Sequence, residues 1–351
     1  MYISICIPQF NRTDHVIELF KSIERQDFES FEICVSDGGS TDGRTDEVES
    51  YLRTSGLPFK YIRSVSNVRY DANLRSAISL ASGRYAFLMG NDDALSDSAA
   101  LSDVARALKA APSAVAAVTN YMEQGTKTTF RRMTSTGLLG SGPLTAARVF
   151  RHYAFVSGVI FDGQLARAAA TDCVDGSEMY QMYLGSRLVA AGGDFLAIDR
   201  LCVVKDVQIS GQQVDSYRLR EKVAAWPLRE HRQPMGRLLE TVWSGIDVGS
   251  DRVSAMEAAN LVAQQLYAYT YPFWIFEHRR VQSYGYALGF YWGLRPSVVA
   301  AIVPFTEIQR AGLWVRYLLG GVIAFLSPLW LFDGLRPSLY RLAKRSRLSS
   351  R

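Results

Sequence analysis

Acidic and amide side chains gather in two short polar stretches, each directly after an apolar, β-rich run. The first is Asp37-Gly38-Gly39-Ser40-Thr41-Asp42-Gly43 and the second is Gly90-Asn91-Asp92-Asp93. A carboxylate on a glycine-rich turn can accept hydrogen bonds from a base or a ribose, and closely spaced oxygen ligands suit Mg²⁺ or Mn²⁺. Taken singly, each stretch has a simpler interpretation as a turn or a helix start. Together they indicate stabilisation of a leaving diphosphate.

The elements that must position these stretches alternate between strand and helix patterns. Strands are expected at residues 3–7 (ended by Pro8), 31–36, 59–63 and 85–89, with helices between them. Residues 126–136 are expected to form a loop or hairpin, residues 178–191 a helix and residues 195–204 a strand. Repeated βα units predict an α/β fold with a mostly parallel sheet and helices on both faces. The polar stretches then lie with Asn11 beyond the carboxyl ends of the strands, where such sheets bind ligands.

Several commoner sites are excluded by missing motifs. The first βα turn has no glycine, so the dinucleotide fingerprint is absent, and the chain has no Gly-Lys pair for a P-loop. The four cysteines are far apart and form no CxxC pair, which argues against a zinc site or a disulfide framework and favours a reducing cytoplasm. The chain opens directly into a strand-like run, so no signal peptide is expected.

The first hundred residues resemble the GT-A fold of inverting family-2 nucleotide-sugar glycosyltransferases. The matching segments are Ile5-Cys6-Ile7-Pro8-x-Phe10-Asn11-Arg12, Val35 through Gly43, Asn73 with Ala81-Ser82-Gly83-Arg84-Tyr85, and Gly90 through Asp93. The resemblance implies the following roles: Pro8 and Asn11 line the nucleotide pocket, Asp37 contacts the nucleobase, Asp92 approaches the sugar or ribose, and Asp93 binds the metal on the diphosphate. Asn91 takes the first position of the family's DxD element, where its amide oxygen can still accept a hydrogen bond.

The catalytic base is where the sequence departs furthest from the family. Many members carry Glu-Asp on a later helix, and that Asp position falls here on Gln181, which cannot take a proton at neutral pH. Glu178 lies three residues earlier, which in a helix is one turn away on the same face, and Asp175 lies just before it. Both are candidates for the base. The alternative interpretation makes residues 175–178 a helix capping box.

Charge divides the chain into two parts. The net charge of +5 combines −3 over residues 1–267 with +8 over residues 268–351, where 11 basic residues face 3 acidic ones. The apolar runs 258–276 and 317–332 are interrupted by polar residues or proline and fall short of the roughly 20 apolar residues of a transmembrane helix. They suit helices lying in a membrane interface, with Trp314 and Trp330 at headgroup depth and Arg341, Lys344 and Arg345 facing an anionic surface. A buried helical domain or a homo-oligomer interface is the alternative, and no nucleic-acid module is present.

These observations predict two regions and one activity. Residues 1–215 form a GT-A catalytic domain, with a nucleotide-binding half (about 1–100) and an acceptor half (about 101–215), and residues 216–351 form a helical, membrane-associating region. The resemblance implies inverting, metal-dependent sugar transfer from a nucleoside-diphosphate-sugar, in bacterial O-antigen or capsule-like synthesis. The acceptor is expected to be a lipid-linked saccharide, because a membrane-associating region would hold the enzyme beside a substrate anchored in the bilayer, on the cytoplasmic face of the inner membrane. The alternatives are a polyprenyl-phosphate sugar synthase, whose acceptor needs no deprotonation, and a non-catalytic GT-A scaffold subunit, which Asn91 and Gln181 favour.

Overall fold

The structure is a computed structural model that describes residues 1–209, 235–248 and 251–334. It divides into two compact units, Met1–Ser216 and Tyr217–Arg351. We describe each unit by itself, beginning with the one that carries the acidic stretches.

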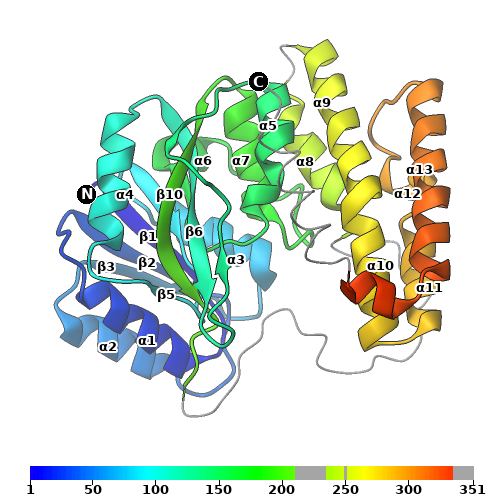
Figure 1. The fold of residues 1–351 in the computed structure, drawn as a ribbon. Helices are drawn as coiled ribbons and strands as arrows, with labels where there is room; N and C mark the ends of the chain where they lie inside the picture. Colours follow the sequence, from blue (N-terminus) through cyan, green and yellow to red (C-terminus); the bar gives the residue numbers. More distant parts are fainter. Residues whose placement is uncertain (210–234, 249–250, 335–351) are drawn as a thin grey trace. The chain divides into compact units, whose positions relative to one another are not determined.

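A mixed ten-stranded sheet forms the centre of the first unit (Figure 1), in the order β3-β2-β1-β4-β9-β6-β10-β5, with β7 beside β6 and β8 beside β10. Its strands are β1 (Ile3–Gln9), β2 (Phe31–Asp37), β3 (Phe59–Arg63), β4 (Tyr85–Leu88), β5 (Ala94–Leu95), β6 (Ala114–Glu123), β7 (Thr129–Phe130), β8 (Gly137–Leu138), β9 (Val159–Asp162) and β10 (Asp194–Lys205). The first four strands in sequence order pair in parallel, as predicted. Strand β9 is antiparallel to both of its neighbours, and β6 and β10 are again parallel. The predicted hairpin around residues 126–136 is present as β6 paired with β7.

Strand β1 continues through Pro8, so the predicted end at this proline was wrong. The N–H of Met89 donates to the carbonyl of Cys6, so the backbone N–H and C=O groups of the even-numbered residues of β1 point toward β4. The register between β1 and β4 ends at Cys6. Pro8 therefore faces the β4 side beyond that register, where the ladder needs no N–H donor.

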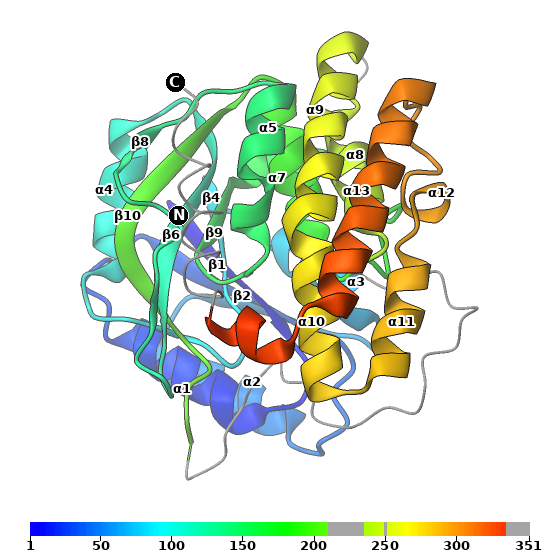
Figure 2. The same ribbon diagram turned by 45° about the vertical axis from the view of Figure 1, so that its right-hand side comes forward.

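Helices cover both faces of the sheet (Figures 1 and 2). They are α1 (Thr13–Glu24), α2 (Thr45–Ser55), α3 (Arg69–Ser79), α4 (Ala100–Ala110), α5 (Pro143–Val149), α6 (Gly163–Ala168) and α7 (Tyr180–Ala190). The main core forms where α1, α2 and α4 pack on one face, with Phe20, Leu52 and Leu101 among the residues buried against Ile3, Ile5 and Ile7 of β1. Helices α3, α6 and α7 lie on the opposite face (Figure 1). This layering leaves the carboxyl ends of β1, β2 and β4 at one edge of the sheet.

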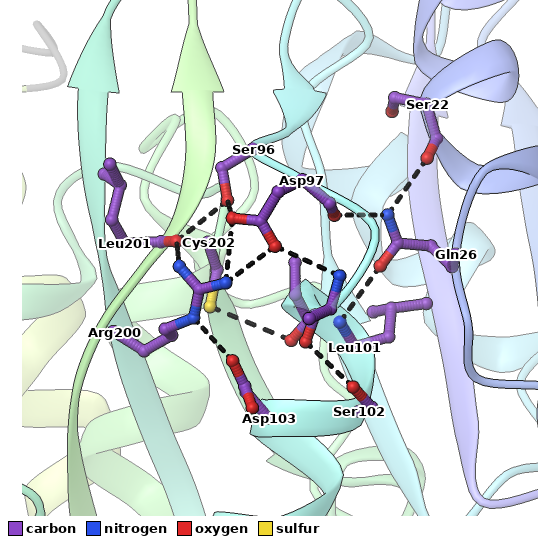
Figure 3. Close-up of polar contacts among 12 residues, drawn as sticks. Ser22, Gln26, Ser96, Asp97, Leu101, Ser102, Asp103, Arg200, Leu201 and Cys202 are labelled. Atoms are coloured by element: carbon purple, nitrogen blue, oxygen red, sulfur yellow. Dashed lines mark hydrogen bonds and ion pairs between the residues drawn. The ribbon is translucent and has the colours of Figure 1, made fainter.

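A polar corner fixes the strand that follows the acidic stretch (Figure 3). Arg200 of β10 donates to both oxygens of Asp97 (2.6 and 2.8 Å) and to Asp103 at the start of α4 (2.7 Å). Gln26, after α1, donates to the carbonyl of Asp97 (2.7 Å). Bonds from one guanidinium to two carboxylates are charge-assisted and directional. The corner therefore ties β10 to the turn after β5.

The second unit is helical over its described residues. Its helices are α8 (Leu238–Ile246), α9 (Arg252–Gln265), the π-helix η2 (Leu266–Thr270), α10 (Tyr271–Val281), α11 (Tyr284–Gly293), α12 (Pro296–Val299) and α13 (Glu307–Leu326). Tyr291 of α11 and Tyr317 of α13 stack at 4.2 Å, and each hydroxyl donates to the other residue's carbonyl (3.2 and 3.1 Å). Gly321 is required beside this pair, because a Cβ there would lie 2.4 Å from the Tyr291 hydroxyl oxygen.

Among the residues that the structure describes, none of the helices is both long enough and apolar enough to cross a membrane.

Candidate active site

The first βα turn is fastened to the second by Asn11. Asn11 and Arg12 both have left-handed backbone angles, with φ of 52° and 56°. The N–H of Asn11 donates to the hydroxyl of Ser40 (2.8 Å), and the side-chain oxygen of Asn11 accepts the N–H of Thr41 (2.8 Å). Pro8 is buried within β1 opposite Ser36. The structure thus brings Asn11 together with the glycine-rich turn and places Pro8 inside the strand beneath it.

Asp37 is fully buried at the end of β2 and organises that turn. Its Oδ1 accepts the N–H groups of Gly39 (3.0 Å) and Ser40 (2.7 Å), and its Oδ2 accepts the hydroxyl of Tyr61 (3.2 Å). Burial and the Asp37 charge raise the pKa of Tyr61. The simple turn interpretation therefore accounts for three acceptor positions of Asp37, and its contact with a nucleobase stays a prediction.

Close approach of neighbouring groups explains Gly38 and Gly39 of this turn. A Cβ on Gly38 would lie 2.7 Å from the side-chain nitrogen of Asn73, and one on Gly39, whose φ is 87°, would lie 2.5 Å from backbone atoms of Ser66. The Asn73 nitrogen donates to the carbonyl of Gln9 (2.8 Å). The Asn73 oxygen is buried without a hydrogen-bond partner among the described residues. An acceptor without a donor next to this turn is what a bound base or ribose could satisfy.

The second acidic stretch is held against the first turn. Asn91 donates from its side-chain nitrogen to Gln9 Oε1 (2.8 Å) and to the carbonyl of Phe10 (3.3 Å). Asp92 forms an ion pair with Arg12. Asn91, Asp92 and Asp93 are all buried. Sequence reasoning missed Gln9, although it stands next to Pro8 in the matching opening segment.

Asp93 accepts hydrogen bonds from two segments that are distant in the sequence. Its Oδ2 accepts the hydroxyl of Ser157, and its Oδ1 accepts the N–H of Asp206 (3.0 Å). Burial, and next the charge of Asp92, raise the pKa of Asp93 well above its usual range. Ser157 and Asp206 are functional candidates that no sequence signal indicated, because neither belongs to a motif.

The donor set fits a hard divalent cation that is shared with a substrate. Among the described residues no three histidine, cysteine or acidic side chains are grouped closely enough to hold a metal by themselves. Mg²⁺ and Mn²⁺ are commonly bound by one or two protein carboxylates together with substrate phosphates. Asp92 and Asp93 are adjacent, buried and mutually repelling, which a cation would relieve. If the cation binds here, Asp93 is the residue placed to hold it, with Asp92 beside it.

The two candidates for the base differ sharply in their surroundings. Asp175 forms a bidentate ion pair with Arg75 of α3, with one N···O distance of 2.8 Å, so its oxygens are already occupied. Glu178 is exposed and has a φ of 58°. Although Glu178 is exposed, partial desolvation of its carboxylate by neighbouring atoms, and next the charge of Asp71, raise its pKa. A carboxylate with a raised pKa is the better proton acceptor, so this arrangement favours Glu178 over Asp175.

The capping box that the alternative interpretation placed at residues 175–178 is absent, and the helix begins later than predicted. Helix α7 starts at Tyr180. Asp71 of α3 accepts the N–H of Tyr180 (3.0 Å) and that of Glu178 (2.8 Å), which lies just before the helix. Glu178 therefore precedes the helix and does not share a helical face with Gln181. Gln181 is buried in α7, where its oxygen accepts the hydroxyl of Tyr70 (3.2 Å).

In the second unit, two of the predicted membrane residues are exposed. Trp314 on α13 and Trp330 just after it both lie at the surface. Arg341, Lys344 and Arg345 lie outside the described residues.

Comparison with known proteins gives a family match for the first part of the chain. Residues 4–170, which include both acidic stretches, match Glycosyl transferase family 2. The chain contains a family 2 glycosyltransferase domain. The abequosyltransferase RfbV of Salmonella typhimurium is 39% identical to it over 97 residues, which are 27% of this chain and 29% of that protein. The GalNAc(5)-diNAcBac-PP-undecaprenol beta-1,3-glucosyltransferase of Campylobacter jejuni is 28% identical over 93 residues, 26% of this chain and 30% of that protein.

Solved structures share the fold of the family 2 domain at low sequence identity. S. aureus TarS 1-349 in complex with UDP superposes with a TM-score of 0.59 and 15% identity, over 96% of this chain and 92% of that chain. The mannosyltransferase PcManGT from Pyrobaculum calidifontis, in complex with GDP-Man and Mn²⁺, gives 0.53 and 15%, over 98% and 86%. These likenesses agree with the predicted GT-A fold. The matches to the two curated relatives span less than a third of those proteins' lengths.

Proposed function

We propose that this chain is an inverting glycosyltransferase that moves a sugar from a nucleoside-diphosphate-sugar to a lipid-linked saccharide in bacterial surface-polysaccharide synthesis. The observation that carries the proposal is the position of Asp92 and Asp93. Both are buried at the carboxyl edge of a family 2 domain. Asp92 pairs with Arg12 and the adjacent Asn91 bonds to Gln9, so this stretch is held to the first βα turn, which Asn11 links to the Asp37 turn. The named activities of the two curated relatives support the pathway.

In this mechanism each polar group of the site has one task. The Asp37 turn and Asn11 position the nucleoside, and Asp93 with Asp92 would hold Mg²⁺ or Mn²⁺ against the diphosphate. When bound, the cation would neutralise the negative charge that develops on the leaving diphosphate. The acceptor hydroxyl oxygen attacks the anomeric carbon as the bond from that carbon to the diphosphate oxygen breaks, and Glu178 takes the hydroxyl proton.

A lipid-linked acceptor is supported by the Campylobacter relative, whose name specifies an undecaprenol-diphosphate saccharide. The same-fold alternative, a polyprenyl-phosphate sugar synthase, is favoured by Gln181, since a phosphate acceptor needs no base. Labelled donor offered with polyprenyl-diphosphate-linked saccharide and with polyprenyl phosphate separates the two. Product from the saccharide alone supports the proposal, and product from the phosphate alone refutes it.

The donor is identified by a thermal-shift screen with UDP-, GDP-, dTDP- and CDP-sugars, each with and without Mn²⁺. A shift that appears only with one nucleotide plus Mn²⁺ supports the metal assignment. Hydrolysis of that donor by the purified protein would exclude the third alternative, a non-catalytic scaffold. Asp93→Asn serves as the matched negative control.

We further propose that the second unit holds the enzyme on an anionic membrane surface, peripherally and on the cytoplasmic face. On α13 the residues that pack inward are Leu313, Tyr317, Gly321 and Ala324. From Val315 onward, six aliphatic side chains of α13 remain more than half exposed: Val315, Leu318, Leu319, Val322, Ile323 and Leu326. Burying such a side chain contributes roughly 1.5–3 kcal/mol, so this row favours an apolar environment. No acidic residue occurs between Glu307 and Asp333, and the +8 charge of residues 268–351 complements anionic headgroups.

Vesicle sedimentation tests this proposal with a matched pair of double variants. The wild-type chain should sediment with phosphatidylglycerol-containing vesicles more than with phosphatidylcholine alone. Leu318→Gln/Val322→Gln should lose binding, whereas Val65→Gln/Val253→Gln, at two exposed apolar positions off this row, should keep it. If the wild type ignores both vesicles and instead self-associates in sedimentation velocity through the same row, the membrane proposal is wrong and an oligomer interface replaces it.

A further inference from the structure

Arg132, in the connection between β7 and β8, is held in a cage of main-chain oxygens. Its three guanidinium nitrogens donate to four carbonyls: Nε to Thr119 (2.5 Å), Nη1 to His152 (3.1 Å) and Phe155 (2.9 Å), and Nη2 to Ser157 (2.7 Å). Those carbonyls belong to β6 and to the segment that precedes β9. One side chain thus clamps residues 152–157 onto the sheet.

Arg132 forms no ion pair with a carboxylate among the described residues. Its guanidinium carbon lies 5.3 Å from the ring centre of Tyr121 and 5.7 Å from that of Phe155, within the range of a cation–π contact. Burial lowers the pKa of Arg132 to about 10, which still leaves it charged at neutral pH. Arg132 is partly buried, and a partly desolvated charge is held here by carbonyl oxygens instead of a paired carboxylate, which suggests a positioning role for it.

The reason lies at the other end of Ser157. The carbonyl of this residue accepts from Arg132, while its hydroxyl accepts the N–H of Gly90 (2.7 Å) and donates to Oδ2 of Asp93. Gly158 allows the close approach, because a Cβ there would lie 2.8 Å from Nη2 of Arg132. Arg132 is therefore two hydrogen bonds away from the carboxylate that the proposed function assigns to the metal.

We propose that Arg132 is a positioning residue for Asp93, acting through Ser157. It fixes the residue 152–157 segment so that the Ser157 hydroxyl holds one oxygen of Asp93 in the orientation needed for a divalent cation. The inference rests on the proposed function, because it takes Asp93 as the metal-binding carboxylate. Groups that orient a metal ligand typically change metal affinity 10–100-fold when they are removed.

The test measures Mn²⁺ binding directly, by electron paramagnetic resonance of free Mn²⁺ added to the purified full chain with UDP, GDP, dTDP or CDP. Ser157→Ala and Arg132→Met should each weaken Mn²⁺ binding about tenfold or more. Arg131→Met is the matched control and should bind like wild type, since the neighbouring Arg131 is exposed. In Ser157→Ala/Arg132→Met the two effects should not multiply, because both remove the same link.

The outcomes separate this inference from the proposed function. If the wild type binds Mn²⁺ and Arg132→Met binds it equally well, or if the two single effects multiply, the inference is wrong while the metal assignment stands. If the wild type binds no Mn²⁺ with any of the four nucleotides, both are overturned. Should Arg132→Met not fold, Arg132→Lys replaces it: one ammonium cannot span all four carbonyls, so at least threefold weaker binding is expected, and wild-type affinity would overturn the inference.

Discussion

Replacing Glu178 by Gln tests the identity of the catalytic base. The change keeps the size of the side chain and removes only its ability to take a proton. General base catalysis contributes about 10²- to 10⁴-fold in rate, which corresponds to about 3–5 kcal/mol of barrier. We therefore expect Glu178→Gln to lower kcat by that factor and to leave donor KM nearly unchanged, because Glu178 lies outside the nucleotide turns.

Asp175→Asn is the matched comparison for this substitution. Asp175 is paired with Arg75 through a half-buried bidentate contact, so its loss should cost roughly 1 kcal/mol of unfolding free energy. Its kcat should stay within about threefold of wild type, since no proton acceptor is removed. Guanidinium unfolding and initial rates with a saccharide acceptor give both quantities from the same preparations.

The pH dependence of the rate is a second test, because a purely structural role of Glu178 would not affect it. The pKa of Glu178 is raised by burial and by Asp71, and lowered by Arg69. A base works only when it is unprotonated, so the rate should fall as pH decreases through this raised pKa. Arg69→Gln removes the lowering influence and should move the acid limb to higher pH. The reasoning is refuted if Glu178→Gln keeps more than half of the activity, or if Arg69→Gln leaves the acid limb in place.

Two further predictions concern stability. Glu32 is buried, and although burial acts to raise its pKa, hydrogen bonds from Ser4 and Ser82 and the contact with Lys60 lower that pKa to about 2. The folded-state pKa is below the unfolded value of about 4.5, so Glu32 contributes stability above that pH, roughly 3 kcal/mol at most, which is lost as pH falls toward 2. The gap in unfolding free energy between wild type and Glu32→Gln should therefore be wide at pH 7 and narrow at pH 3, and an unchanged gap would contradict this. On α13, Gly321→Ala should lower Tm by its clash with Tyr291, whereas Gly312→Ala, where the added methyl meets only the end of Arg316 at 3.4 Å, should hold or raise it. Equal Tm values for the two variants would show that the Tyr291–Tyr317 pair does not set the packing of α13.

Local patterns were sufficient to predict the nucleotide-binding half of the fold. Strand β2 ends at Asp37 and β4 ends just before the second acidic stretch, as the apolar runs indicated. Parallel pairing then brings their polar ends to one edge, so Asn11, Asp37 and Asn91 through Asp93 lie together without further information. The motif residues are thus placed by topology that the sequence already contains.

Long-range contacts could not be predicted in the same way. Asp71 caps α7 from 109 residues away, so the local pattern at residues 175–178 gave the wrong helix start and suggested a capping box that is absent. Asp93 is held by Ser157 and by the N–H of Asp206, which lie in connections with no periodic pattern. Such partners depend on where loops meet in space, and neither hydrophobic period nor motif spacing encodes that meeting.

The two departures from the family pattern have different physical meanings. Asn91 uses its side-chain nitrogen as a donor to Gln9 and Phe10, which an aspartate could not do. An aspartate there would also add a third buried carboxylate beside Asp92 and Asp93, where burial and one neighbouring charge already raise the pKa of Asp93. Asparagine therefore suits this loop, and its presence does not favour a scaffold over an enzyme.

Gln181 carries more weight, because it occupies the expected position of the base and is buried against Tyr70. The loop before α7, however, contains Glu178, which is exposed and has a raised pKa. If a base is needed, it has moved from the first turn of α7 to the residue before its N-cap. If none is needed, the acceptor is a phosphate. The activity of Glu178→Gln with a lipid-linked saccharide and with polyprenyl phosphate thus decides between the two proposed enzymes. In either case the glutamine at position 181 follows from the chemistry of the acceptor.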